Sequence, residues 1–185
     1  MDTPWLDRHQ LRAWIRLRAV LALLPGALDA QLRRDADLTE FEYQVLAMLS
    51  EAPGRTLRMT ELARRTNATL PRLSHVVTRM EGRGLVERFP CPEDRRAINA
   101  RLTDGGWAKV QQAAPGHVAT VRRHVIDALT EEQIDQLVAI GDAVLARLDP
   151  SGTMAATYTL YDEAPEAPPR EETDDGSQRA ADLAP

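Results

Sequence analysis

The sequence predicts a mainly α-helical fold that carries one small β-hairpin. Apolar residues recur at helical spacing along much of the first 148 positions. Thr39 and Thr130 each stand three positions before a Glu or Gln, which is the capping box that begins a helix. Residues 85–89 and 97–102 alternate enough to be paired strands. With 185 residues, 43% of them hydrophobic, the chain is long enough for one well-cored domain.

The first predicted helix spans residues 11–32. Its apolar residues stand three or four positions apart and are Leu11, Trp14, Leu17, Leu21, Leu24, Leu28 and Leu32. Pro25-Gly26 interrupts this run, so we expect a kink or break there. The second predicted helix begins at the capping box of Thr39 and Glu42 and ends at Pro53-Gly54.

Two short helices follow, separated by a polar turn. The first covers residues 60–65 and the second covers residues 70–83. Thr69 is the expected N-cap of the second, and Pro71 is tolerated in its first turn because that position needs no intrahelical N–H bond. Its inward face is predicted to be Leu73, Val76, Val77 and Met80. Its outward face is predicted to be Arg72, Ser74, His75 and Arg79.

A charged hairpin comes next. Residues 90–96 form the expected loop between the two strands, with Arg95 and Arg96 near its tip. Asp94 would be costly beside phosphate, so we expect it to brace Arg88 or Arg96 through a charge-assisted hydrogen bond. Cys91, the single cysteine, excludes an intrachain disulfide. Its nearby arginines could lower a thiol pKa, but a cysteine in an exposed loop is usually a bystander.

The remaining chain predicts two more helices and a tail. The first begins at residues 103–106 and continues from Trp107 toward Leu129, and we expect Pro115-Gly116 to disturb it. The second runs from the Thr130 capping box to Leu148. We therefore divide the chain into a helical dimerisation region (1–35 and 103–149), a lobe (36–102) and an acidic, disordered tail (150–185), within which 151–161 is ambiguous.

Charge is unevenly distributed along the chain. The net charge is −5, yet residues 54–101 carry eleven arginines and five acidic residues. Residues 162–185 carry two arginines and eight acidic residues. This asymmetry indicates a polyanion site on the lobe, with a tail that either solubilises the protein or competes for the basic face. No apolar run could span a bilayer and no secretory signal stands at the start, so we expect a cytoplasmic protein.

Helices 60–65 and 70–83 match a helix-turn-helix, whose second helix enters the major groove of DNA. Arg72 is the best candidate for a guanine contact, and Arg79 for a phosphate contact. The hairpin, residues 86–102, would place an arginine in the minor groove. The expected DNA-binding residues are Thr69, Pro71, Arg72, Ser74, His75, Arg79, Arg95 and Arg96. The alternatives are a solvated helix face with a charged hairpin, or a winged-helix protein-interaction module, which would not need the basic field.

Four segments carry a resemblance to a known family. They are Glu61-Leu62-Ala63, residues 77–88 (VTRMEGRGLVER), residues 92–96 (PEDRR) and residues 102–106 (LTDGG). Together they resemble the multiple antibiotic resistance regulator (MarR) family of winged-helix repressors. The resemblance covers residues 8–148, and the Asp-Arg-Arg of the hairpin followed by Leu-Thr is its most specific part.

The resemblance implies a homodimeric repressor whose first, fifth and sixth helices form the dimer arm. Two-fold symmetry then predicts an inverted-repeat operator with half-sites roughly 10 bp apart. Members of this family are commonly released from DNA by small aromatic or phenolic anions held between arm and lobe. The candidate ligand-binding residues are Trp14, Arg18, Tyr43, Trp107 and His117, although each aromatic could instead be core packing.

Catalysis is not expected. The four histidines show no metal-ligand spacing, and the sequence has neither a phosphate-binding loop nor a nucleophile motif. We therefore expect no enzyme activity, no metal and no cofactor, with double-stranded DNA and a second copy of the chain as partners.

Overall fold

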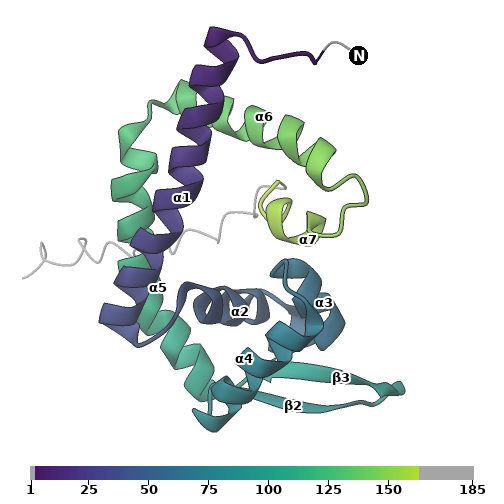
Figure 1. Cartoon of the computed structure of the whole chain (residues 1–185). Coiled ribbons are helices and arrows are strands. Elements are labelled where there is room, and N and C mark those ends of the chain that lie inside the picture. Colours follow the sequence, from purple (N-terminus) through teal and green to yellow (C-terminus); the bar gives the residue numbers. More distant parts are fainter. Residues whose placement is uncertain (1–2, 163–185) are drawn as a thin grey trace, which may run out of the picture.

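The computed structural model describes residues 3–162, which form a helical arm and a smaller lobe (Figure 1). The arm consists of α1 (Arg8–Ala36), α5 (Asp104–His124) and α6 (Glu131–Leu148). Helices α1 and α5 run side by side, and α6 leads away from the far end of α5 after a short 3-10 turn, Ile126–Ala128. The mainly helical fold with a small antiparallel sheet is confirmed.

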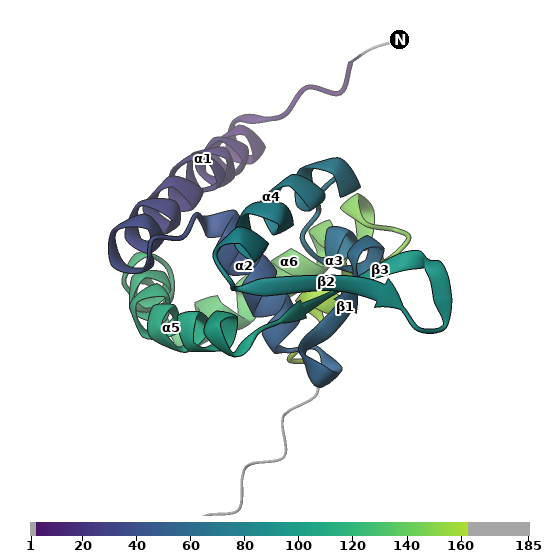
Figure 2. The same cartoon turned by 90° about the horizontal axis from the view of Figure 1, so that it is seen from below.

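The lobe combines three helices with a three-stranded antiparallel sheet (Figure 2). Its elements in chain order are α2 (Glu40–Ser50), a 3-10 turn (Pro53–Arg55), β1 (Thr56–Arg58), α3 (Met59–Arg65), α4 (Leu70–Gly82), β2 (Val86–Cys91) and β3 (Asp94–Leu102). The strand order is β1-β3-β2, so the long strand β3 is central. The sequence did not predict β1, because three residues are too few to show an alternating pattern.

The lobe core forms where α2, α3 and α4 pack over the sheet. The predicted inward face of α4 is confirmed: Leu73, Val76, Val77 and Met80 are all buried. They meet Leu46 and Leu49 of α2, Leu62 of α3 and Leu102 of β3 in one apolar cluster. Truncating such a leucine to alanine costs about 2–5 kcal/mol. This core holds α4 rigidly and leaves its opposite face to solvent.

Helix boundaries follow their capping residues closely. Thr39 and Thr130 both form complete capping boxes, as predicted. Helix α1 begins earlier than predicted, because Asp7 and Gln10 form a further capping box. The expected break at Pro25 is absent: α1 continues through it, with Pro25 and Leu21 on the exposed side, where water can satisfy the freed carbonyl group. Helix α5 likewise continues through Pro115 and ends at His124 rather than near Leu129.

The hairpin is longer and its turn tighter than predicted. Strand β2 reaches Cys91 and β3 begins at Asp94, with a register irregularity between Pro90 and Cys91. Cys91 is only 3% exposed, so the expectation of an exposed loop cysteine was wrong. Its Sγ lies 3.6 Å from the guanidinium of Arg58, which belongs to β1 on the other side of the central strand β3. The sequence pattern missed this because Pro90 interrupts the alternation of the strand.

After α6 the chain returns to the lobe. Helix α7 (Ala155–Tyr158) packs against α3, and the Thr157 hydroxyl donates a hydrogen bond to the Arg65 carbonyl oxygen at 3.0 Å. We expected disorder over residues 150–185, but residues 155–158 of that tail form α7, held against the lobe by contacts with α3. Residues 163–185 lie outside the described residues. Within residues 3–162, no helix is both long and apolar enough to cross a membrane.

Candidate nucleic-acid interface

Helices α3 and α4 are joined by a tight turn that sets the start of α4. Asn67 in this turn adopts a positive φ of 46°, a conformation that asparagine tolerates well. Thr69 then caps α4, its Oγ1 accepting a hydrogen bond from the Arg72 backbone N–H, and Pro71 lies in the first turn. The Thr69 and Pro71 side chains are exposed. The N-terminal end of α4 is therefore open to a partner.

Arg72 projects from the first turn of α4 and is exposed. Its Cζ atom lies over the Phe41 ring of α2, 4.4 Å from the ring centroid. Phe41 is half-buried and packs against the lobe core. The ring therefore gives the guanidinium a fixed support, a contact that the sequence pattern did not reveal.

His75 and Ser74 differ in how available they are. His75 is exposed on α4, one turn beyond Arg72. Ser74 is half-buried, and its Oγ accepts a hydrogen bond from the Arg88 guanidinium at 3.3 Å. His75 is thus free to meet a partner, whereas Ser74 already belongs to a network between α4 and the hairpin.

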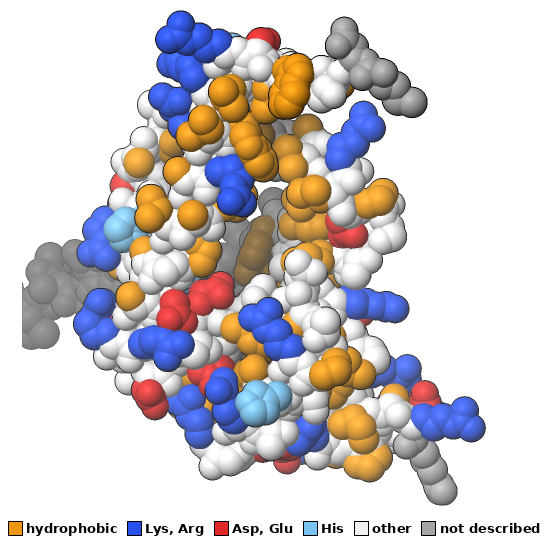
Figure 3. Space-filling view, in the orientation of Figure 1, with side chains coloured by type: hydrophobic (Ala, Val, Ile, Leu, Met, Phe, Trp, Pro, Cys, Tyr) orange, Lys and Arg blue, Asp and Glu red, His pale blue; other side chains and the backbone are white. Residues whose placement is uncertain are grey.

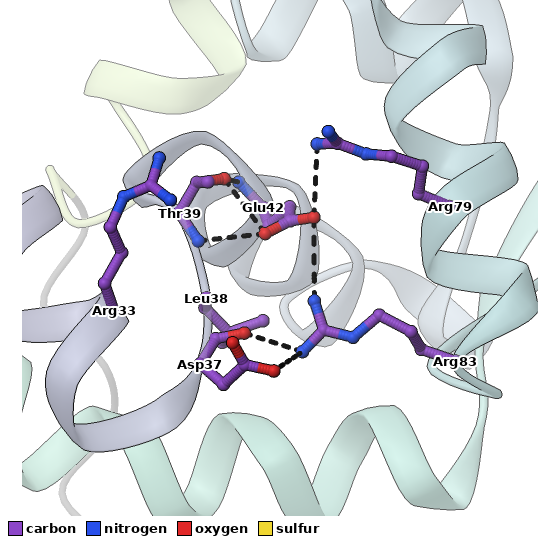
Figure 4. A pocket seen from close by; sticks show the side chains of 7 residues that line it. All are labelled: Arg33, Asp37, Leu38, Thr39, Glu42, Arg79 and Arg83. Atoms are coloured by element: carbon purple, nitrogen blue, oxygen red, sulfur yellow. Dashed lines mark hydrogen bonds and ion pairs between the residues drawn. The ribbon is translucent and has the colours of Figure 1, made fainter.

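Arg79 lies over a shallow hollow between α4 and the start of α2 (Figure 4). Its guanidinium is 3.3 Å from Glu42, a carboxylate that is only 6% exposed. Arg83 lies 3.6 Å from the same carboxylate oxygen and also bonds Asp37. The other Glu42 oxygen accepts from the Thr39 backbone N–H at 2.9 Å. Glu42 thus caps α2 and anchors two arginines, Arg79 of α4 and Arg83 at its C-cap. The capping-box pattern alone does not indicate this second role.

Arg88 joins the hairpin to the same helix. Its backbone N–H donates a hydrogen bond to Glu81 Oε1 at 2.9 Å. Its guanidinium donates to Glu81 Oε2, and to Thr78 Oγ1 at 2.9 Å. The expectation that Asp94 braces Arg88 or Arg96 was wrong in this form. Asp94 instead accepts a hydrogen bond from the backbone N–H of Arg96, at 3.0 Å. Arg88 pairs with Glu81 instead, because the Glu81 side chain projects from the last turn of α4 directly over β2.

The hairpin itself extends away from the lobe beside the α3–α4 unit (Figures 1 and 2). Arg96 is exposed on β3, two residues after the strand begins. Arg95 precedes it in β3, and its side chain lies outside the described part of the structure. The exposed side of α4 and the hairpin together offer two separate basic elements to a polyanion.

The residues expected to bind a ligand lie in three places. Trp14 and Arg18 form an exposed pair on α1, with the guanidinium 5.9 Å from the ring centroid. Tyr43 and His117 meet between α2 and α5, their ring centroids 4.5 Å apart. Trp107 is ten residues before His117 on α5, which is about 15 Å along the helix. Within one chain the five do not line a single pocket.

The Tyr43–His117 pair is the most enclosed of these places. Burial lowers the pKa of His117 and raises that of Tyr43. His117 Nδ1 and the Oε1 of the buried Gln31 have no hydrogen-bond partner among the described residues. Residues 3–162 hold no cluster of His, Cys, Asp or Glu arranged to bind a metal ion.

Known proteins match both the lobe and the arm. The sequence model of the MarR family matches residues 38–98. Sco3205, a MarR family transcriptional regulator from Streptomyces coelicolor whose structure was solved in complex with DNA, is 43% identical. The match covers 81% of this chain and 94% of Sco3205, with a TM-score of 0.78. The chain belongs to the MarR family.

Two further relatives agree with this assignment. AbsC, a MarR family transcriptional regulator from Streptomyces coelicolor, is 39% identical over 79% of this chain and 98% of AbsC, with a TM-score of 0.76. The transcriptional repressor YetL from Bacillus subtilis is 31% identical, over 60% of this chain and 66% of YetL. All three relatives are named as transcriptional regulators or repressors, in agreement with the expectation that the chain is not an enzyme.

Proposed function

We propose that this MarR-family protein is a homodimeric transcriptional repressor that binds an inverted-repeat DNA operator. Helix α4 would enter the major groove, and the hairpin of β2 and β3 would enter the minor groove. The observation that carries the proposal is the joint exposure of Arg72 and His75 on α4 and Arg96 on the hairpin, with Arg88 tying the two elements together. The DNA-bound structure of the 43% identical Sco3205 supports it.

The exposed arm supports the homodimer. Many large apolar side chains of α1, α5 and α6 face solvent in the single chain, and Figure 3 shows them gathered over the upper part of the molecule. Helix α6 has no buried residue at all. Apolar surface on this scale marks an interface. A second copy of the chain, packed arm to arm, is the occupant we propose.

A small aromatic or phenolic anion is the ligand that we propose for regulation. The Tyr43–His117 pair would offer ring contacts, and the unpartnered His117 Nδ1 and Gln31 Oε1 would offer polar ones. Trp14 and Arg18 are exposed on the arm and could approach such a site only from the partner subunit. Thermal unfolding with a series of hydroxybenzoic acids tests this. Neither stabilisation nor release of DNA would contradict it.

Footprinting on a selected duplex tests DNA binding. We expect dyad-symmetric protection with half-sites about one helical turn apart, and a dimer by sedimentation. Arg96→Ala should weaken binding to all sequences and reduce the slope of log K against log salt by about 2, because the dimer carries Arg96 twice and each subunit loses one cationic contact with the DNA. Protection without a dyad, or a monomer that binds as tightly, would contradict the proposal.

A further inference from the structure

We propose that Phe41 is a positioning residue for base recognition, holding the Arg72 guanidinium ready to contact a guanine. This inference rests on the proposed function, since it assigns a role to a residue outside the DNA-contacting face. It names the base that the α4 end of the site should prefer. Three features of the structure support it: the place of Arg72, the rigidity of Phe41 and the free donors of the guanidinium.

Arg72 stands where a recognition helix contacts bases. It is the third residue of α4, and the N-terminal residues of such helices meet base edges in the major groove. An arginine there can donate two hydrogen bonds to O6 and N7 of one guanine. A guanidinium already held in one orientation favours this contact, because a freely rotating arginine loses more side-chain entropy on binding.

Phe41 provides the support for that orientation. It is the second residue of α2, one residue before the Glu42 that closes the capping box with Thr39. The ring is half-buried against the lobe core, and this packing restricts its rotation. With Arg72 Cζ 4.4 Å from the ring centroid, the contact lies well inside the range of a cation–π interaction, about 6 Å.

The Arg72 guanidinium differs from its neighbours in having uncommitted donors. Arg79, Arg83 and Arg88 each pair with a carboxylate on the lobe. Among the described residues, no hydrogen bond or ion pair engages the Arg72 guanidinium. A cation over a ring is attracted by the ring face, which leaves the N–H donors at its edge available.

The second phenylalanine of the chain provides a matched comparison. Phe89 in β2 also lies beneath an arginine, Arg101, at 5.1 Å from the ring centroid. However, the Arg101 Nε donates to Glu87 at 2.6 Å. This arginine is therefore already paired, and Phe89 is not expected to prepare it for a base.

Selection of binding sites from random duplex DNA tests the inference with the full-length protein. Arg72→Ala first identifies the base pair at which a guanine preference disappears. Phe41→Leu should weaken that same preference by about two- to fivefold and leave the other positions unchanged. Phe41→Tyr, which keeps the aromatic face, should retain it. Phe89→Leu should keep the preference at that base pair.

The outcomes distinguish a failure of the Arg72 base contact from a failure of the role of Phe41. If Arg72→Ala alters no base preference, Arg72 does not contact a base, and both its proposed role and this inference fail. If Arg72→Ala abolishes the preference but Phe41→Leu retains it, DNA recognition stands and only the role of Phe41 is overturned. A Phe41→Tyr protein as defective as Phe41→Leu would also overturn it. Thermal unfolding checks each variant, and Phe41→Met replaces Phe41→Leu if the latter melts below the assay temperature.

Discussion

The carboxylate of Glu42 lies 3.3 Å from the guanidinium of Arg79, and this ion pair joins the first turn of α2 to α4. Glu42 is only 6% exposed, so its charge depends on these partners for solvation. Its other oxygen accepts hydrogen bonds from the backbone N–H and hydroxyl of Thr39. One side chain thus fixes the entry into the lobe and the far end of the helix that we propose contacts DNA.

Replacing Glu42 by glutamine should destabilise the protein. The glutamine amide can still accept a hydrogen bond from Thr39 but cannot balance the charges of Arg79 and Arg83. We expect the free energy of unfolding to fall by only about 1–2 kcal/mol, because both arginines are partly exposed and screened by solvent. Urea unfolding measures it. Glu87→Gln is the matched control, because Glu87 bonds Arg101 on the exposed hairpin and should cost at most about 0.5 kcal/mol. Equal losses would contradict the role of Glu42.

Arg88→Ala should uncouple the hairpin from α4. Arg88 contacts Glu81, Ser74 and Thr78 along one side of that helix, and both members of the Glu81–Arg88 pair are 28% exposed. Removing the side chain leaves the half-buried Glu81 carboxylate without its cation, with the backbone N–H of residue 88 as its remaining bond to β2, so we expect a loss of about 1–3 kcal/mol in unfolding free energy. Minor-groove protection in a footprint should weaken more than major-groove protection.

The control for Arg88 is Arg101→Ala, which removes an exposed ion pair within the hairpin. That change should leave the angle between hairpin and helix intact. A footprint in which both variants lose protection to the same extent would show that charge, and not the link to α4, governs hairpin contacts.

The sequence predicted the backbone of the lobe better than its ion pairs. Capping residues such as Thr39 and Thr130 act within one turn, so their helix starts could be recognised locally. The inward face of α4 followed from spacing alone. Pro25 does not end α1, because it lies on the exposed side of the helix, where water can satisfy the freed carbonyl group.

Long-range contacts were beyond the sequence pattern. Glu42 and Arg79 are 37 positions apart in the sequence, and Phe41 and Arg72 are 31 positions apart. Nothing local distinguishes an arginine that is paired on the protein, such as Arg88, from one left free, such as Arg72. These contacts depend on how α2, α4 and β2 pack, which is determined by the whole core.

Burial of His117 should make stability depend on pH. Burial holds the pKa of its imidazole below the usual value of 6.5. The folded state therefore binds the proton less readily than the unfolded state. The stability contributed by neutral His117 is complete above about pH 6.5, and it is lost as the pH falls through the pKa of the folded state. Between pH 7.5 and 5.5 the melting temperature should fall more for the wild type than for His117→Gln.

The control for this titration is His9→Gln, because His9 is exposed at the start of α1. That variant should follow the wild-type pH profile. Parallel profiles for the wild type and His117→Gln would show instead that burial at the α2–α5 contact does not control protonation.

The return of the chain after α6 should stabilise the lobe through Thr157. Its hydroxyl donates to the Arg65 carbonyl, one of the last carbonyls of α3, which no further turn of that helix can satisfy. Thr157→Val keeps the shape and removes the donor, so we expect a loss of about 1 kcal/mol in thermal unfolding and faster amide exchange in the turn after α3. Thr159→Val is the control, because its hydroxyl donates to Ala155 within α7. If both variants show the same stability and amide exchange, the contact of α7 does not stabilise α3. If only Thr157→Val speeds exchange in the turn, this contact stabilises the segment that leads from α3 into α4.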